Sequence, residues 1–216
     1  MNSNFAKSLA AIALAEIRMD HLIVSMASSV LGMSRVILGD DSGWGDLERC
    51  LRLALANGFQ EQAARAYTNL SAMAVSRRRY DEAARFLSSG IAYCEERDLD
   101  FLLPYMLAYR ARLKFEQGNW LGASEDAEAV LRHPRTTPIT RIPALRTLGH
   151  LRIRRGDPDA KSPLEEARAL AGPQPELQRF GTLAAVAAEA AWLVPWMMRH
   201  YSPRRDGTSS RVTSLV

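Results

Sequence analysis

Apolar residues recur along residues 61–97 with the period of an amphipathic helix. In each half of this stretch they are spaced by three or four residues, which puts them on one helical face, and a short turn separates the halves. The pattern therefore predicts two helices joined as a hairpin. A single hairpin cannot bury both apolar stripes, so units of this kind stack on one another. The stripes comprise Ala63, Ala66, Tyr67, Leu70 and Ala74, then Tyr80, Ala83, Ala84, Leu87, Ile91 and Cys94.

Similar stretches lie on both sides of this hairpin, and glycine or proline separates them. Gly118 is a typical helix stop, and Asp157 is placed to cap a helix that begins at Pro158. Residues 135–140 form a polar linker, after which we expect Pro143 to open a helix, because proline costs no hydrogen bond in a first turn. The other predicted helices span residues 6–18, 20–38, 44–56, 102–117, 120–131, 143–155, 158–171 and 176–193.

The turns recur at nearly regular intervals. The second helix of each predicted pair begins at Trp44, Tyr80, Trp120 or Pro158, at intervals of 36, 40 and 38 residues. This period is slightly longer and more variable than the 34 residues of a strict tetratricopeptide repeat. We therefore expect an all-α fold: a right-handed superhelical array of antiparallel helix hairpins, tetratricopeptide-like, with about four and a half units. The array is expected to occupy residues 1–201, followed by a disordered basic tail at residues 202–216.

Charge changes this prediction little. The formal net charge of +4 and the pI near 9.3 at first favour nucleic-acid binding. However, Arg199, Arg204, Arg205 and Arg211 lie near the C-terminus, and the repeats without them are close to neutral, so we expect no direct DNA binding by this chain. Three arginines at residues 77–79 follow a predicted helix, whose C-terminus favours cations; a docking patch for an acidic partner is the alternative.

The cysteines and the apolar segments indicate the compartment. Cys50 and Cys94 lie on apolar helix faces and form no disulfide framework, which suits a reducing cytoplasm. The apolar stretch after Lys7 resembles a signal peptide, but it is short and continues as a helical pattern. Residues 22–38 are interrupted by serines and Arg35, which argues against a membrane span. We therefore expect a cytoplasmic protein without membrane contact.

Several separate phrases of the sequence point to one family. They are GWGDLER (residues 43–49), ARAYTNL (64–70), GIAYCEERDLD (90–100), RIPAL (141–145), RRGDP (154–158) and AEAAWL (188–193). Together they resemble the tetratricopeptide region of large bacterial ATP-binding transcriptional regulators of the LuxR/MalT type, which also occurs in relatives that carry a nucleotide-cyclase domain. The resemblance covers residues 20–193 and implies a sensor or interaction segment.

The chain also departs from that family. It contains no Gly-x-x-x-x-Gly-Lys-Ser/Thr run, so nucleotide hydrolysis is not carried over, and no recognition helix follows Leu193. We expect either a segment of a longer regulator, a stand-alone adaptor, or a non-functional fragment of a P-loop ATPase or cyclase-type protein. The helix at residues 184–193 lacks a partner, so residues 194–201 fold back over it or two chains self-associate there.

Catalytic and metal chemistry find no support in the sequence. His21, His133, His150 and His200 are scattered, and no Cys-x-x-Cys or nucleophile elbow occurs. The acidic turn that begins at Asp40 lacks the glutamate of a calcium loop. We expect a non-catalytic protein without cofactor or metal.

A basic, aromatic lining is the candidate for function. In tetratricopeptide arrays the first helix of each hairpin lines the concave surface. The positions that would face a ligand are Arg65, Asn69, Tyr105, Tyr109, Arg112, Arg146, His150 and Arg154, with Glu189 in the fifth unit. Such a lining suits a protein or peptide partner that is acidic or ends in a carboxylate. The alternatives are ordinary solvated positions, or regulation by nucleotide or DNA contact within a longer parent.

Overall fold

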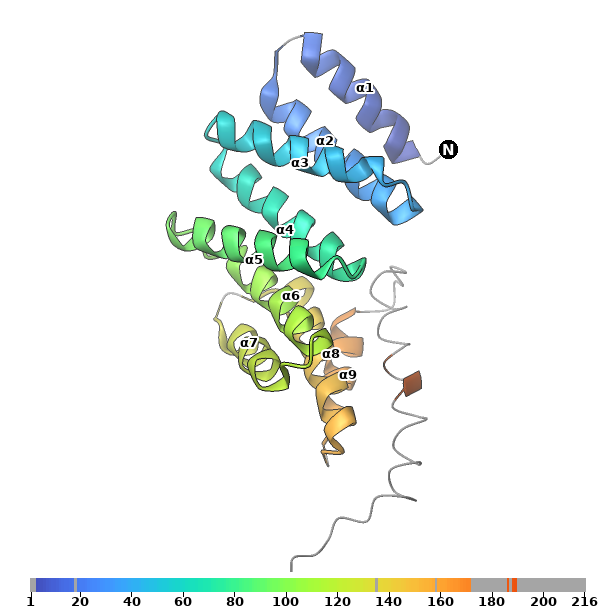
Figure 1. Cartoon of the computed structure of the whole chain (residues 1–216), viewed down its shortest axis with the longest axis vertical. Helices are drawn as coiled ribbons and strands as arrows, with labels where there is room; N and C mark the ends of the chain where they lie inside the picture. Colours follow the sequence, from blue (N-terminus) through green and yellow to red (C-terminus); the bar gives the residue numbers. More distant parts are fainter. Residues whose placement is uncertain are drawn as a thin grey trace, which may run out of the picture.

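The computed structural model describes residues 3–17, 19–134, 136–157, 159–171, 186, 188 and 189. Within these residues the chain forms helices and turns and no strand, so the predicted all-α class is confirmed (Figure 1). The helices are α1 (Ser3–Ile17), α2 (His21–Leu38), α3 (Ser42–Ala56), α4 (Gln60–Ser76), α5 (Tyr80–Glu95), α6 (Leu103–Glu116), α7 (Trp120–Arg132), α8 (Pro138–Arg155) and α9 (Ser162–Ala171).

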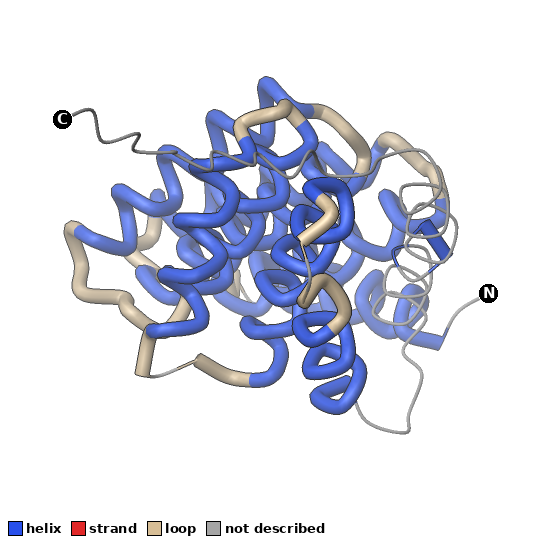
Figure 2. The backbone as a smooth tube through the Cα atoms, turned by 90° about the horizontal axis from the view of Figure 1, so that it is seen from below, coloured by secondary structure: helices blue, strands red, loops and turns tan. Residues whose placement is uncertain are grey.

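The helices form one elongated stack that follows the order of the chain, from α1 at one end to α9 at the other (Figure 1). Short turns join α2 to α3, α4 to α5 and α6 to α7, and each of these pairs packs together as a hairpin; α8 packs on α9 in the same way. The first helices also contact one another in sequence, α2 with α4, α4 with α6 and α6 with α8. Figure 2 gives the view along the stack, from below.

Glycine ends several of these helices in the left-handed conformation. Gly58, Gly118 and Gly156 have φ angles of 68°, 84° and 74°, as expected for residues that follow a helix C-terminus. Arg78 and Asp98 occupy the same conformation at φ 58° and 54°, although both carry a Cβ atom. These two turns, which flank α5, are therefore strained, as is the turn at Met19, whose φ is 55°.

The core of the stack centres on the hairpin of α4 and α5. Leu70 and Leu87 are fully buried there, and Gly90 lets α5 approach α4 and α6 so closely that an added Cβ would lie 2.8 Å from atoms of Tyr67 and Met106. The predicted apolar stripes are confirmed in most positions. The exception is Ala84, which is exposed because it lies at the edge of the α5 stripe.

The predicted starts of the last two helices are wrong. Half of the segment predicted as a linker, residues 138–140, belongs to the first turn of α8, which begins at Pro138 after an extended Thr137. Pro143 lies inside the helix. Helix α9 begins at Ser162 instead of residue 158, with Pro163 in its first turn. In both cases the sequence offers two prolines, and either is acceptable in the first turn of a helix, so the prolines alone do not fix the start.

Helix α2 could cross a membrane by length and composition alone, with a mean hydropathy of 1.5. It is 44% buried against the rest of the chain and carries buried polar contacts, such as the Ser25 hydroxyl donating to the Cys50 carbonyl at 3.0 Å. A core helix of a folded domain has the same properties. The predicted tail at residues 202–216, and the pairing of the helix at residues 184–193, lie outside the described residues apart from residues 186, 188 and 189.

Candidate functional site

Six of the eight residues predicted to face a ligand lie on the adjoining faces of α6 and α8. Those on α6 are spaced by four and three residues and those on α8 by four, so each set lies on one side of its helix. The two helices pack together, and Arg146 of α8 lies within electrostatic range of Tyr105, Tyr109 and Arg112 of α6. We call the following set the α6–α8 cluster: Tyr105, Tyr109, Arg112, Arg146, His150 and Arg154.

Glu116 neutralises one cation of this cluster. Arg112 Nε donates to Glu116 Oε1 at 2.7 Å, one helical turn along α6, and the Tyr80 hydroxyl donates to Glu116 Oε2 at 2.9 Å. Arg112 Nη1 also donates to the Ser76 hydroxyl at 3.3 Å. Both carboxylate oxygens of Glu116 are therefore engaged, and the network ties α6 to the preceding hairpin.

Tyr105 and Tyr109 form an aromatic pair beside these charges. Their ring centroids are 5.0 Å apart at an interplanar angle of 48°, a favourable tilted geometry. The Tyr105 hydroxyl donates to the Tyr109 hydroxyl at 3.4 Å. Because Tyr109 accepts this bond, its own proton can be donated to a further acceptor.

Arg146 differs from the other arginines of the cluster. It is half-buried, and among the described residues it makes no ion pair and no hydrogen bond. Burial, and to a lesser extent the neighbouring positive charge of Arg112, lower the pKa of its guanidinium from 12.5 to about 10, against the weaker influence of Tyr109 and Glu116. A cation in this environment lacks the anion that would stabilise it.

At the other end of the cluster, Glu189 engages the two remaining basic residues. His150 Nε2 lies 2.6 Å from Glu189 Oε2, and Arg154 Nε donates to Glu189 Oε1 at 2.8 Å. The Phe115 ring packs against both, 4.6 Å from the His150 ring and 5.1 Å from the Arg154 guanidinium. The predicted fifth unit therefore does contribute Glu189 to this face, as a partner of the cluster.

Burial and hydrogen bonding together set the charge states of His150 and Glu189. Burial lowers the pKa of His150 below 6.5, and the hydrogen bond to Glu189 only partly opposes it, so the imidazole is neutral at pH 7 with its Nε2–H donating. Burial would raise the pKa of Glu189, but the hydrogen bonds from Arg154 and His150 outweigh it and lower the pKa. Glu189 is therefore an anion, and its charge offsets that of Arg154.

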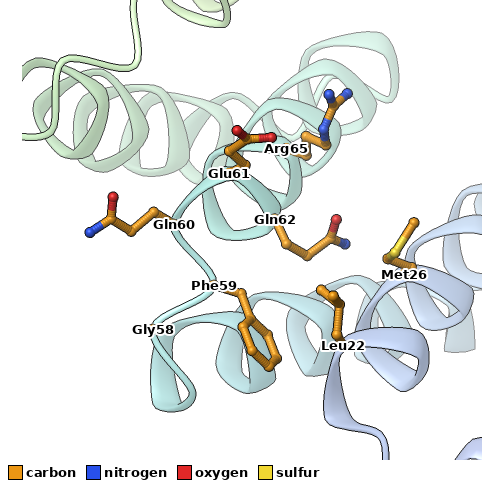
Figure 3. A pocket seen from close by; sticks show the side chains of 8 residues that line it. All are labelled: Leu22, Met26, Gly58, Phe59, Gln60, Glu61, Gln62 and Arg65. Atoms are coloured by element: carbon orange, nitrogen blue, oxygen red, sulfur yellow. The ribbon is translucent and has the colours of Figure 1, made fainter.

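The other two predicted residues lie elsewhere, on α4. Asn69 Nδ2 donates to the Ser29 hydroxyl of α2 at 2.9 Å, which occupies its amide. The Arg65 guanidinium lies 5.7 Å from the centre of the Phe101 ring. Arg65 also borders an open pocket of about 690 Å³ between α2 and the start of α4, which Figure 3 shows from close by. The pocket is lined by Leu22, Met26, Gly58, Phe59, Gln60, Glu61, Gln62 and Arg65.

Two of the arginines at the turn between α4 and α5 bind within the stack. Arg77 donates to the carbonyl oxygen of Ile37 at 3.0 Å, at the C-terminal end of α2. The Arg79 guanidinium lies 4.1 Å above the ring of Trp44 on α3. Of these two, Arg77 lies at a helix C-terminus, but it is that of α2 and not that of α4.

Sequence reasoning missed several partners of these residues. Glu116 follows Arg112 by four positions, a spacing that could have indicated the ion pair. Asp126 of α7 accepts hydrogen bonds from Arg110 Nε and Nη2 at 2.8 Å each and pairs with Lys114 at 2.8 Å. No spacing within one helix indicated these contacts, because Asp126 lies on a different helix from Arg110 and Lys114. Within the described part of the chain, no group of three or more His, Cys, Asp or Glu side chains is placed to hold a metal ion.

A scan against protein-family models finds no match to this chain, and no curated protein matches its sequence. The α6–α8 cluster must therefore be interpreted from its own chemistry. It offers guanidinium and phenol donors around one uncompensated positive charge, an arrangement suited to binding an anionic group.

Proposed function

We propose that this chain is a non-catalytic recognition module that binds a protein or peptide partner carrying acidic groups at the α6–α8 cluster. The observation that supports it best is the convergence of basic and aromatic side chains from α6 and α8, which are far apart in the sequence, around the half-buried, unpaired Arg146. Charge-assisted hydrogen bonds to carboxylates are the strongest contacts that such donors make.

We also propose that the stack is a right-handed, tetratricopeptide-like superhelix of about four and a half units. Hairpins in chain order, consecutive packing of α2, α4, α6 and α8, and near-regular turns support this arrangement. In such an array the first helices line the ligand-binding side, which agrees with the position of the cluster on two of them.

In biological terms, we propose the sensor or interaction segment of a LuxR/MalT-like bacterial transcriptional regulator in the cytoplasm. The support is the set of sequence phrases that resemble those regulators. The alternative is a stand-alone adaptor or a non-functional fragment of a P-loop ATPase or cyclase-type protein. Sequencing the DNA on both sides of the reading frame discriminates them, since a neighbouring ATPase and helix-turn-helix favour the regulator. Direct DNA binding by this chain is not part of the proposal.

The proposal of acidic-partner recognition is tested by calorimetry with peptides rich in Asp and Glu. The double variant Arg112→Ala with Arg146→Ala should weaken binding at least about tenfold, since it removes two charged donors. The matched control is Arg52→Ala with Arg132→Ala, which removes the same charge from side chains that are 67% and 70% exposed. Equal affinity of the wild type and the cluster variant would exclude the α6–α8 cluster as the binding site.

Self-association through the C-terminal helix is a separate proposal. It concerns residues 184–193, and light scattering over a range of concentrations tests it. A monomer whose Trp192 and Trp196 are both fully quenched by solvent contradicts it, because pairing or fold-back over that helix would protect these side chains.

A further inference from the structure

In the α6–α8 cluster and its acidic partners, the positive charges outnumber the negative charges by one. In the layer of Arg112, the single carboxylate of Glu116 already accepts hydrogen bonds from Arg112 and Tyr80, and it also lies within electrostatic range of Arg146. In the next layer, neutral His150 and charged Arg154 share Glu189. The excess charge therefore belongs to Arg146, which lies between the two layers on α8.

Leaving Arg146 unpaired works against folding. A half-buried guanidinium beside another guanidinium loses hydration without gaining an ion pair, and burial together with Arg112 lowers its pKa to about 10. An unpaired charge in a packed interface is typical of a functional position, because the energy is recovered only when an anion arrives. The same residue is therefore the point of the cluster most favourable to an incoming anion.

The surroundings of Arg146 limit the charge of that anion. On the α6 side, Glu116 lies within electrostatic range of Arg146. On the other side, Glu189 contacts His150, which lies one helical turn after Arg146 on α8. A phosphate dianion would bring two charges between these carboxylates, with one excess cation to balance them. A single carboxylate matches the charge of Arg146 and the fork of its donors.

We propose that Arg146 anchors one carboxylate of the bound partner, with the hydroxyl of Tyr109 as a second donor. This inference rests on the proposed acidic-partner recognition and names its anchor and its ligand chemistry. The paired rings of Tyr105 and Tyr109 lie within electrostatic range of Arg146, and Arg146 itself is half-buried, so an ion pair formed there is less screened by water than one on the open surface. The carboxylate is that of a chain terminus or of an Asp or Glu side chain.

The test uses three short acetylated peptides of one neutral sequence. The first has a free C-terminal carboxylate, the second a C-terminal amide, and the third the amide with one central Glu. Binding to the full-length chain is followed through the arginine Nε–H signals in NMR spectra, with inorganic phosphate as a fourth probe. We expect binding of the first or third peptide, or both, and at least about tenfold weaker binding of the amide. Which of the two carboxylate peptides binds tighter assigns the source.

Variants separate the anchor from the rest of the cluster. Arg146→Gln should lose at least about tenfold in affinity for the carboxylate peptides, and Arg146→Lys should retain part of it, because the charge remains while the fork is lost. Arg132→Gln on α7 is the matched control and should change affinity less than about threefold, since it removes one positive charge from a side chain that is 70% exposed and lies outside the cluster. Melting temperatures measured in parallel show that each variant is folded.

The outcomes distinguish the role of Arg146 as anchor from the recognition of acidic partners by the cluster as a whole. Loss of binding with Arg112→Gln while Arg146→Gln binds normally overturns the anchor and keeps the recognition site. Equal affinity for the carboxylate peptides and the amide, or phosphate binding that is at least as tight, overturns the single-carboxylate assignment. Failure of every carboxylate peptide and of the Asp- and Glu-rich peptides to bind overturns the recognition function as well.

Discussion

Gly32 of α2 and Gly43 of α3 lie against each other at the point where the two helices come closest. A Cβ built on Gly43 would lie 2.5 Å from the carbonyl oxygen of Gly32, and one built on Gly32 would lie 2.7 Å from the carbonyl oxygen of Gly43. Real Cβ atoms do not approach a backbone atom this closely. The pair therefore allows the backbones of α2 and α3 to touch.

Gly43→Ala should destabilise the chain by about 1–3 kcal/mol, because the added methyl group collides with backbone instead of a flexible side chain. Gly45→Ala, two residues along the same helix, is the matched control: no atom lies within 4 Å of its Cβ position. That substitution should stabilise the chain by up to about 1 kcal/mol through helix propensity. Denaturant unfolding measures both, and equal effects would show that the contact is not limiting.

Asp126→Asn should cost about 3 kcal/mol, because it leaves Arg110 and Lys114 without their anion in a site where the Asp126 side chain is only 9% exposed. Glu166→Gln is the control; it removes the partner of Arg141 at a surface where the carboxylate is 46% exposed, and should cost less than about 1 kcal/mol. Urea unfolding at pH 7 gives both values.

Asp126 also predicts a pH dependence. Burial would raise the pKa of its carboxyl, but hydrogen bonds from Arg110 and Lys114 outweigh burial and lower the pKa below 3.8. Its contribution is therefore complete above the unfolded pKa of about 3.9 and is lost as pH falls through the lower folded value. The stability difference between wild type and Asp126→Asn should be constant from pH 7 to 5 and shrink below about pH 4. A difference that grows in acid would contradict this assignment.

Arg146→Gln should stabilise the ligand-free chain by about 1 kcal/mol, which raises the melting temperature by about 2–4 °C in a chain of this size. The reason is that the folded state holds this cation without a partner, as the lowered pKa of about 10 reflects. The penalty is present at neutral pH and disappears as pH rises above about 10, since the unfolded chain then binds more protons than the folded one. Arg112→Gln should have the opposite sign, because it leaves Glu116 with one partner fewer. Calorimetric melting of the two variants checks this contrast.

Glu189→Gln should strengthen binding of acidic peptides by about threefold. The substitution frees Arg154 from its internal carboxylate and adds one net positive charge to the cluster. Glu128→Gln on α7 makes the same change of net charge at a carboxylate paired with Arg132 on the surface, and should leave affinity unchanged. Calorimetry with one acidic peptide compares the two variants, and an equal gain for both would indicate a nonspecific charge effect.

The sequence pattern predicted the local structure well where one periodicity dominates. Helices α2 to α7 lie within a few residues of their expected positions, because apolar spacing and glycine stops act within a single turn. The start of α8 could not be predicted, since Pro138 and Pro143 are equally acceptable in a first turn. Burial of Thr140 and Ile142 decides it, and that depends on the neighbouring helices.

The candidate site divides in the same way. Spacing alone placed Arg146, His150 and Arg154 on one face of a helix. Glu116 pairs with Arg112, and Glu189 pairs with His150 and Arg154, which leaves Arg146 as the unpaired cation. These pairings depend on how α6, α8 and the later segment are aligned along one another. No periodicity within one helix encodes that register, and the close approach of Gly32 and Gly43 is hidden for the same reason.

The strained turns on either side of α5 make the α4–α5 hairpin unsuitable for transfer into another protein. Arg78 and Asp98 adopt a conformation that glycine favours, so the α4–α5 hairpin does not gain its geometry from its own turns. Its shape is imposed by the helices above and below, which bury Leu70 and Leu87. The hairpin with the clearest sequence signature is therefore a poor module for transplantation. Excised from the stack, it would lose the packing that keeps its turns closed.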